Sequence, residues 1–388
     1  MSDYVARLGS VDLLKGVLIV AIVFVHLVLS RSDILFGAAD AAVDIGPQGE
    51  STTSLLIQAL YLGLMIFFIF SGYFYRPGRG FKENMRKRFF QLVVALSICA
   101  IVLPIIIYIW MAVWGKAPDI SDILIAFQWG FGLNGVFEPL DVFTEHPICG
   151  ACVGYYFLWG MVWGFLIFYA VADRVYGDWK KTVLVIAILL VVTTVYRMFV
   201  DMKLPFYAQI GPIAAAFMLA GMLLAEHDVI AKIESFSFRS AKCWGIFLGS
   251  VLLAVVLVCL FPSGLEFDYL NIGRYGWFSA FIYFVEAMVM FVVMMHLSVF
   301  LSKASLIREL FDVPGRHTLG ILLLHGFVAT MMFVPFFNKG NGSWVPDDMG
   351  LAPSLIIALA TVVVCVIICE YGKKYLEKGM DKFLTKTE

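Results

Sequence analysis

Residues 7–26 read RLGSVDLLKGVLIVAIVFVH, an apolar run that contains a lysine at position 15 and a histidine at position 26. Lys15 and His26 are eleven residues apart, which on an α-helix is three turns plus about 20°, with a rise of about 16 Å. Both side chains are therefore expected on one helix face. A titratable group inside a bilayer is costly, so each of the two predicts a function and a partner.

The composition of the whole chain is that of a membrane protein. Hydrophobic residues make up 61% of the 388 positions, charged residues 15%, and the mean hydropathy is +0.90. Soluble domains carry about 25% charged residues, so the sequence predicts an all-α polytopic membrane protein. No basic face extends beyond the short cytoplasmic loops, which argues against a nucleic-acid partner. The charged first run lacks a cleavage pattern and predicts a retained helix.

Apolar runs of about twenty residues predict about ten transmembrane helices. No repeat or appended soluble domain is expected, so residues 1–388 form one transmembrane domain whose chemistry lies in or between the helices. The predicted spans are 11–30, 54–75, 89–114, 152–172, 181–200, 206–225, 243–262, 277–301, 317–337 and 353–372.

The distribution of basic residues predicts the orientation. With the N-terminus inside, 21 of the 28 Lys and Arg residues fall in inner segments and six in outer segments, while Lys15 lies within the first span. Because positively charged loops stay cytoplasmic, both termini are expected in the cytoplasm. The long outer segments 31–53 and 115–151 either shape a substrate entrance or form solvated caps.

His26 is the leading candidate for chemistry, since histidine titrates near neutral pH and can take a proton from a hydroxyl. The plainer interpretation is a buried neutral histidine satisfied by a neighbouring helix. Asp12 lies three residues before Lys15, and an i,i+3 ion pair would hold the lysine at the cytoplasmic mouth, where it could meet an anionic ligand.

Two further buried groups are candidates to assist His26. His325 ends the stretch HTLGILLLH, 317–325, and is expected about 13 Å into the ninth span, at a depth similar to that of His26. Glu286 lies within FIYFVEAMVMF of the eighth span, where a carboxylate should face the bundle interior. A backbone bond for the histidine and a Tyr or Trp partner for the glutamate are the structural alternatives.

The second inner segment carries six basic residues between positions 76 and 88. One interpretation is that this loop only fixes the topology and contacts anionic lipid headgroups. The other is that its last three basic residues, Arg86, Lys87 and Arg88, bind the phosphates of a cytoplasmic cofactor. A Walker or dinucleotide glycine pattern is absent. His146, Cys149 and Cys152 in EHPICGAC give only a weak zinc signal, so no metal site is predicted; the two cysteines are either free thiols or a local disulfide.

Four segments together resemble the membrane-bound acyltransferase 3 family. VDLLKGVLIVAIVFVH, 11–26, is similar to its opening signature, in which a histidine follows a basic residue by eleven positions. The second span and loop of the family are similar to IFFIFSGYFY, 66–75, with the basic run ending KRFF. Its fourth span is similar to YYFLWGMVWG, 155–164, and its late histidine helix is similar to GRHTLGILLLH, 315–325.

The resemblance implies a ten-helix protein of a bacterial plasma (inner) membrane that transfers an acyl group, usually acetyl from cytoplasmic acetyl-CoA, to a carbohydrate or lipid-linked glycan outside. His26 corresponds to the family histidine, expected to act as general base or transient acyl carrier, and Lys15 to its basic partner. Relatives often carry Arg-x-x-Arg beside the third span; here the basic residues are contiguous, so the ligands of the CoA phosphates stay open among Arg86, Lys87 and Arg88.

A transporter is the rival interpretation. Helical carriers also place ionisable groups near the membrane midplane, and an exporter of a glycan or a small amino-acid-like solute would use the same buried residues.

Overall fold

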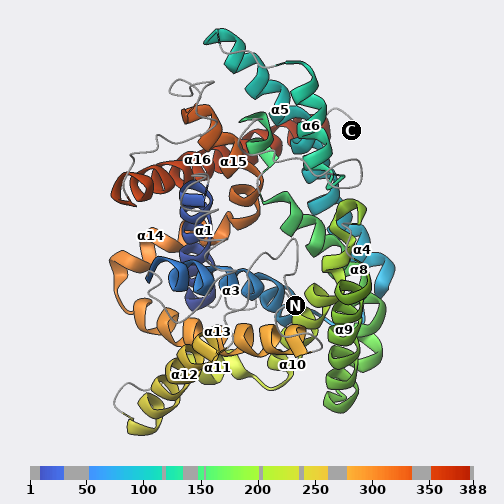
Figure 1. Cartoon of the computed structure of the whole chain (residues 1–388), viewed down its shortest axis with the longest axis vertical. Coiled ribbons are helices and arrows are strands. Elements are labelled where there is room, and N and C mark those ends of the chain that lie inside the picture. Colours follow the sequence, from blue (N-terminus) through green and yellow to red (C-terminus); the bar gives the residue numbers. More distant parts are fainter. Residues whose placement is uncertain are drawn as a thin grey trace.

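The computed structural model describes residues 9–29, 52–115, 119–133, 147–152, 154–200, 204–235, 240–260, 278–333 and 351–384. These residues form helices and no strand (Figure 1). The helices are α1 (Gly9–Leu29), α3 (Thr52–Tyr73), α4 (Gly80–Arg88), the π-helix η1 (Phe89–Val94), α5 (Ala95–Val113), α6 (Ser121–Gly130), the 3₁₀-helix η2 (Pro147–Cys152), α8 (Tyr155–Val175), α9 (Trp179–Phe199), the 3₁₀-helix η3 (Pro205–Ile210), α10 (Gly211–Glu226), α11 (Val229–Glu234), α12 (Ala241–Leu260), α13 (Ser279–Leu301), α14 (Ser305–Arg316), α15 (Thr318–Phe333) and α16 (Leu351–Leu384).

Each of the ten predicted spans coincides with an apolar helix. In the described part of the chain, seven helical segments are long and apolar enough to cross a membrane by length and composition. Within the residues that the structure describes in full, α3, α12 and α15 contribute shorter apolar stretches, Leu62–Tyr73, Ala241–Leu257 and Thr318–Met332. The all-α, multi-pass class is therefore confirmed. The count of ten and the cytoplasmic position of both termini stay predictions.

Helix α1 occupies the interior of the bundle (Figure 1, dark blue). It packs against α3, α13, α14, α15 and α16, which belong to distant parts of the sequence. Its apolar side chains, among them Leu13, Leu18, Ile19 and Val23, are almost completely buried. A polar side chain on this helix is consequently enclosed by protein on several sides, as the cost of burying charge in lipid requires.

Glycines set how closely α1 and α14 approach each other. A Cβ at Gly16 would lie 1.9 Å from the Phe311 carbonyl oxygen, and a Cβ at Gly315 would lie 1.8 Å from the Asp12 carbonyl oxygen. The two backbones therefore touch, which small residues permit at membrane helix crossings. Because α15 follows α14 directly, this crossing fixes the position of α15 relative to α1.

The two histidines meet because the chain changes direction after this crossing. Since Gly16 meets Phe311 and Gly315 meets Asp12, α14 runs antiparallel to α1. Helix α14 ends at Arg316 and α15 begins at Thr318, and α15 runs back along α1 and brings His325 to His26.

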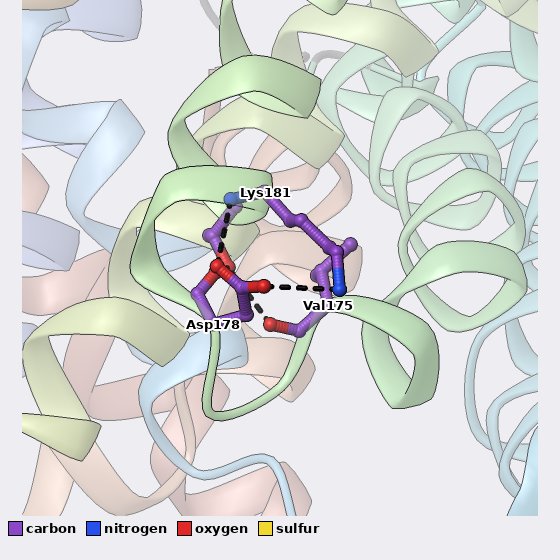
Figure 2. A network of polar contacts seen from close by, with 4 residues as sticks. Val175, Asp178 and Lys181 are labelled. Atoms are coloured by element: carbon purple, nitrogen blue, oxygen red, sulfur yellow. Dashed lines mark hydrogen bonds and ion pairs between the residues drawn. The ribbon is translucent and has the colours of Figure 1, made fainter.

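The turn between α8 and α9 is a compact capped connection (Figure 2). Asp178 is the N-cap of α9: its carboxylate accepts a hydrogen bond from the Lys181 backbone N–H at 3.1 Å and pairs with Lys181 Nζ at 3.0 Å. The hydrogen bond from Lys181 lowers the pKa of Asp178. Gly177, with φ of +77°, makes the turn in the left-handed region that favours glycine.

In the described part of the chain, four α-helices fall in segments that the hydropathy pattern leaves as loops: α4, α6, α11 and α14. Helix α6 lies inside the outer segment 115–151 and packs against α5 and η2. Helix α14 is amphipathic: Leu306, Leu310 and Val313 form an exposed apolar stripe separated from the charged residues of the helix, while Phe311 and Gly315 face α1. Short amphipathic helices do not reach the average hydropathy of a membrane span, so a search for long apolar runs passes over them.

Candidate active site

The structure brings His26 of α1 and His325 of α15 into direct contact. His26 Nδ1 and His325 Nε2 are 2.8 Å apart. The ring centroids are 5.0 Å apart and the ring planes differ by 17°. The 2.8 Å between the nitrogens is so much shorter than the 5.0 Å between the ring centres that the two nitrogens must lie on the line joining the centres. The two imidazoles therefore lie side by side in nearly one plane, joined by an N–H···N hydrogen bond, and are not stacked face to face. His325 is 1% exposed, whereas His26 is partly exposed.

The direction of this hydrogen bond follows from the other nitrogen of His325. Its Nδ1 lies 3.0 Å from the Ile321 carbonyl oxygen and 3.1 Å from that of Leu322. Carbonyl oxygens only accept, so Nδ1 carries the proton, and in the neutral ring Nε2 is then an acceptor. His26 Nδ1–H consequently donates to His325, and the lone pair of His26 lies on Nε2.

Tyr155, the first residue of α8, ties that helix to the histidine pair. Its side chain is completely buried, and its hydroxyl donates to the Leu323 carbonyl oxygen at 2.9 Å, two residues before His325. The preceding residue, Gly154, lies against both imidazole rings. The sequence places Tyr155 only in an aromatic run, and no spacing pattern indicates that the run begins at the histidines.

Lys15 forms the expected ion pair with Asp12, at 2.7 Å between Nζ and Oδ1. The lysine and aspartate side chains are 23% and 15% exposed. Lys15 lies three helical turns from His26 on α1, so the two are separate parts of the site rather than one contact. The carboxylate of Asp12 neutralises much of the charge that Lys15 offers to an anion.

Helix α14 adds further charges beside this ion pair. Burial raises the pKa of Asp312 above its ordinary value, and the neighbouring carboxylate of Asp12 acts in the same direction, while Arg316 and Arg308 oppose the rise. The Oδ1 atom of Asp312 is buried without a hydrogen-bond partner among the described residues. The end of α1 that carries Asp12 and Lys15 is thus a mixed cluster of charges and not a purely cationic site.

The basic residues of α4 divide into two kinds. The Arg88 guanidinium lies 4.5 Å from the Phe165 ring centroid, and its Nε donates to the Tyr169 hydroxyl at 3.2 Å, so it holds α4 against α8. Arg86 and Lys87 are exposed. Arg86 also lines a shallow surface groove with Phe81, Lys82, Met85 and Phe89. Of the three predicted phosphate ligands, Arg86 and Lys87 are the accessible ones.

Glu286 is buried on α13, at 2% exposure, as its position in the apolar run predicts. Helix α13 packs against α1, α3 and α12. The histidine pair joins α1 to α15, so Glu286 belongs to a different neighbour of α1. Its Oε1 has no hydrogen bond among the described residues, although the residue does interact with its surroundings.

The cysteine segment supplies no metal site in the described residues, where no group of three or more His, Cys, Asp or Glu side chains could hold an ion. Cys149 and Cys152 are buried free thiols, at 0% and 3% exposure. His146 lies outside the described residues.

The fold and the site define a class: an α-helical multi-pass membrane protein with a hydrogen-bonded histidine pair in its core. The family model of the acyltransferase domain, acyltransferase 3, matches residues 8–370, and the chain therefore belongs to the membrane acyltransferase 3 family. Comparison with the curated proteins and with the solved structures finds no significant match.

Proposed function

We propose that this membrane acyltransferase is an O-acetyltransferase, with cytoplasmic acetyl-CoA as its donor and a hydroxyl of an extracytoplasmic glycan or glycolipid as its acceptor. Its place is the plasma (inner) membrane of a bacterium. His26 is the general base, and His325 fixes the tautomer of His26. Family membership supports acyl transfer, and the histidine geometry supports these roles.

The observation that carries the proposal is the one-way hydrogen-bond chain of the two imidazoles. It runs from His26 Nδ1–H to His325 Nε2, and from His325 Nδ1–H to the carbonyls of α15. A base that removes a proton needs a lone pair on a nitrogen that can reach the acceptor, and a third group that orients the ring. His26 Nε2 meets the first need and His325 the second.

The chemistry is a single acyl transfer. The acceptor hydroxyl attacks the thioester carbonyl as its proton passes to His26 Nε2. The carbonyl re-forms, the carbon–sulfur bond breaks, and the CoA sulfur leaves with that proton. The products are the acetyl ester and CoA–SH, and His26 regains its lone pair. General-base catalysis of this kind contributes about 10²–10⁴-fold in rate.

On the donor side, Arg86 and Lys87 are proposed to bind the CoA phosphates from the cytoplasm. Both are exposed and free of the packing that holds Arg88. Lys15 is proposed to guide the donor toward His26, with Asp12 limiting its charge. Glu286, on another neighbour of α1, is proposed to orient the acceptor from within the bundle.

The proposal is tested in cells that lack the chromosomal copy and express either the wild-type chain or a variant. Alkali-labile acetate is released from isolated surface glycans and quantified by mass spectrometry. The wild type restores the ester, and His26→Ala lowers it to the level of the empty vector. A His26→Ala protein that restores the ester at equal abundance refutes the proposal.

His296→Ala is the matched control. His296 is also buried on a membrane helix, and its Nδ1 lies 2.7 Å from the Val292 carbonyl of its own helix, the same local bond that His325 makes. This variant removes a buried histidine outside the pair, so it keeps the wild-type ester level.

The alternative function is a transporter, and binding of acetyl-CoA separates the two. A transporter would not bind acetyl-CoA when purified, whereas the acyltransferase would.

A further inference from the structure

We infer that Gly154 is a positioning residue for the acyl transfer: its lack of a side chain seats the His26–His325 pair against the start of α8. The inference rests on the proposed function for its kinetic meaning. Gly154 is the N-cap of α8, with φ of +83° and ψ of −3°. A Cβ on it would lie 3.3 Å from His325 Cε1 and 3.5 Å from His26 Cε1.

The contact lies at the joint between the two rings. The same added Cβ would be 3.8 Å from His325 Nε2, the atom that accepts the hydrogen bond from His26. Among the glycines that the structure describes, Gly154 is the one whose added Cβ would meet both imidazoles. A single backbone position therefore forms one wall of the histidine pair.

An added methyl group at this position is too close to the His325 ring. Carbon atoms pack at about 3.5–4.0 Å, so a Cβ at 3.3 Å must displace something. The Tyr155 hydroxyl ties the start of α8 to Leu323, which prevents Gly154 from withdrawing. His325 is 1% exposed and its Nδ1 is bonded to the α15 carbonyls. The displacement therefore falls on the joint and on the partly exposed His26 ring.

The expected consequence is a loss of turnover with donor binding preserved. Gly154 lies beside the imidazoles, whereas the exposed cations Arg86 and Lys87 are on α4. The added Cβ requires a shift of a few tenths of an ångström. Since a misplacement of about 1 Å of a catalytic group costs up to about 100-fold in rate, this smaller shift should cost less. Gly154→Ala should lower kcat by about 3- to 10-fold and change KM for acetyl-CoA by less than about twofold.

Gly177 provides a matched control on the other end of α8. Its φ is +77°, and a Cβ there would have no atom within 4 Å (the turn of Figure 2). Gly177→Ala therefore carries the same left-handed strain without the contact. Asn tolerates this region better than other residues, so Gly154→Asn and Gly177→Asn reduce the strain and keep the Cβ.

The experiment measures kcat and KM of the four variants with [¹⁴C]acetyl-CoA and membrane glycan acceptor. Both Gly154 variants should lose turnover and both Gly177 variants should keep it. Wild-type turnover in Gly154→Ala, equal losses at the two glycines, or recovery in Gly154→Asn would overturn the inference. If the wild-type protein transfers no acetyl group, or if the His26→Ala variant transfers it equally well, the proposed function fails and not the role of Gly154.

A stability cycle supplies a second readout that needs no activity. Gly154→Ala is measured alone and with His325→Asn, whose shorter side chain removes the ring that the Cβ would meet. The drop in thermal midpoint caused by Gly154→Ala should be smaller in the His325→Asn background than in the wild-type background. An unchanged defect in the His325→Asn background contradicts the contact, because residues that touch are energetically coupled.

Discussion

Replacing His325 by leucine removes the acceptor of the His26 Nδ1 proton. The 2.8 Å bond is the feature that fixes which His26 nitrogen carries the lone pair. His26 becomes cationic as it takes the proton of the acceptor hydroxyl, and a hydrogen bond from a charged donor is stronger than a neutral one by about 1–2 kcal/mol. Since this gain exists only in the transition state, its loss corresponds to about a 5- to 30-fold decrease in kcat. His325→Gln retains a side-chain acceptor and should lose less.

The assay is the initial rate of ester formation at saturating acetyl-CoA, with purified protein in lipid nanodiscs. The expected order of rates is wild type, His325→Gln, His325→Leu and finally His26→Ala. His296→Leu serves as the control for deleting a buried histidine outside the pair. A wild-type kcat for His325→Leu in protein of normal thermal stability would refute the role assigned to His325.

Three further predictions concern the helices around the pair. Gly16→Ala pushes a methyl group into the backbone of α14, so it should destabilise the protein by about 3 kcal/mol or more. Gly249→Ala, in open space on α12, should be neutral or stabilise the protein by up to about 1 kcal/mol. Thermal unfolding compares the two variants, and equal melting temperatures would contradict the close contact of α1 and α14. The raised pKa of Asp312 means that its ionised carboxylate destabilises the folded state. Asp312→Asn should therefore be more stable than the wild type near pH 7, and this advantage should shrink as the pH falls through the raised pKa. A difference in melting temperature that does not change with pH would argue against the burial of this carboxylate. Arg86→Gln should raise KM for acetyl-CoA about fivefold, in a salt-sensitive way, while Arg88→Gln should lower the melting temperature because it loses its contacts with α8; the reverse pattern would show that the two arginines have exchanged roles.

The membrane helices could be read from the sequence because long apolar runs dominate it. In a bilayer the backbone must satisfy its own hydrogen bonds, so a run of about twenty apolar residues has essentially one structure open to it. The amphipathic helix α14 was not predicted in this way. Its place in the fold depends on Gly315 meeting the α1 backbone, a tertiary contact that no hydropathy average contains.

The candidate site was only partly predictable for a similar reason. His26 and His325 stand out as titratable residues at similar depth, and the structure joins them. The direction of their hydrogen bond depends on ring orientation and on the α15 carbonyls, which residue identity does not specify. Gly154 and the Tyr155 anchor were not predicted, because a glycine before an aromatic run gains its meaning only from what packs against it. Arg86 and Arg88 look alike in sequence and differ only once α8 is in place.

The most direct test of the central claim follows the acetyl group itself. Inside-out membrane vesicles from cells producing the wild-type chain or His26→Ala receive [¹⁴C]acetyl-CoA on their outer, formerly cytoplasmic face. Wild-type vesicles should accumulate label as an alkali-labile ester on glycan or glycolipid, and His26→Ala vesicles should not. Equal labelling by the two, at equal protein abundance, would contradict a catalytic role for His26.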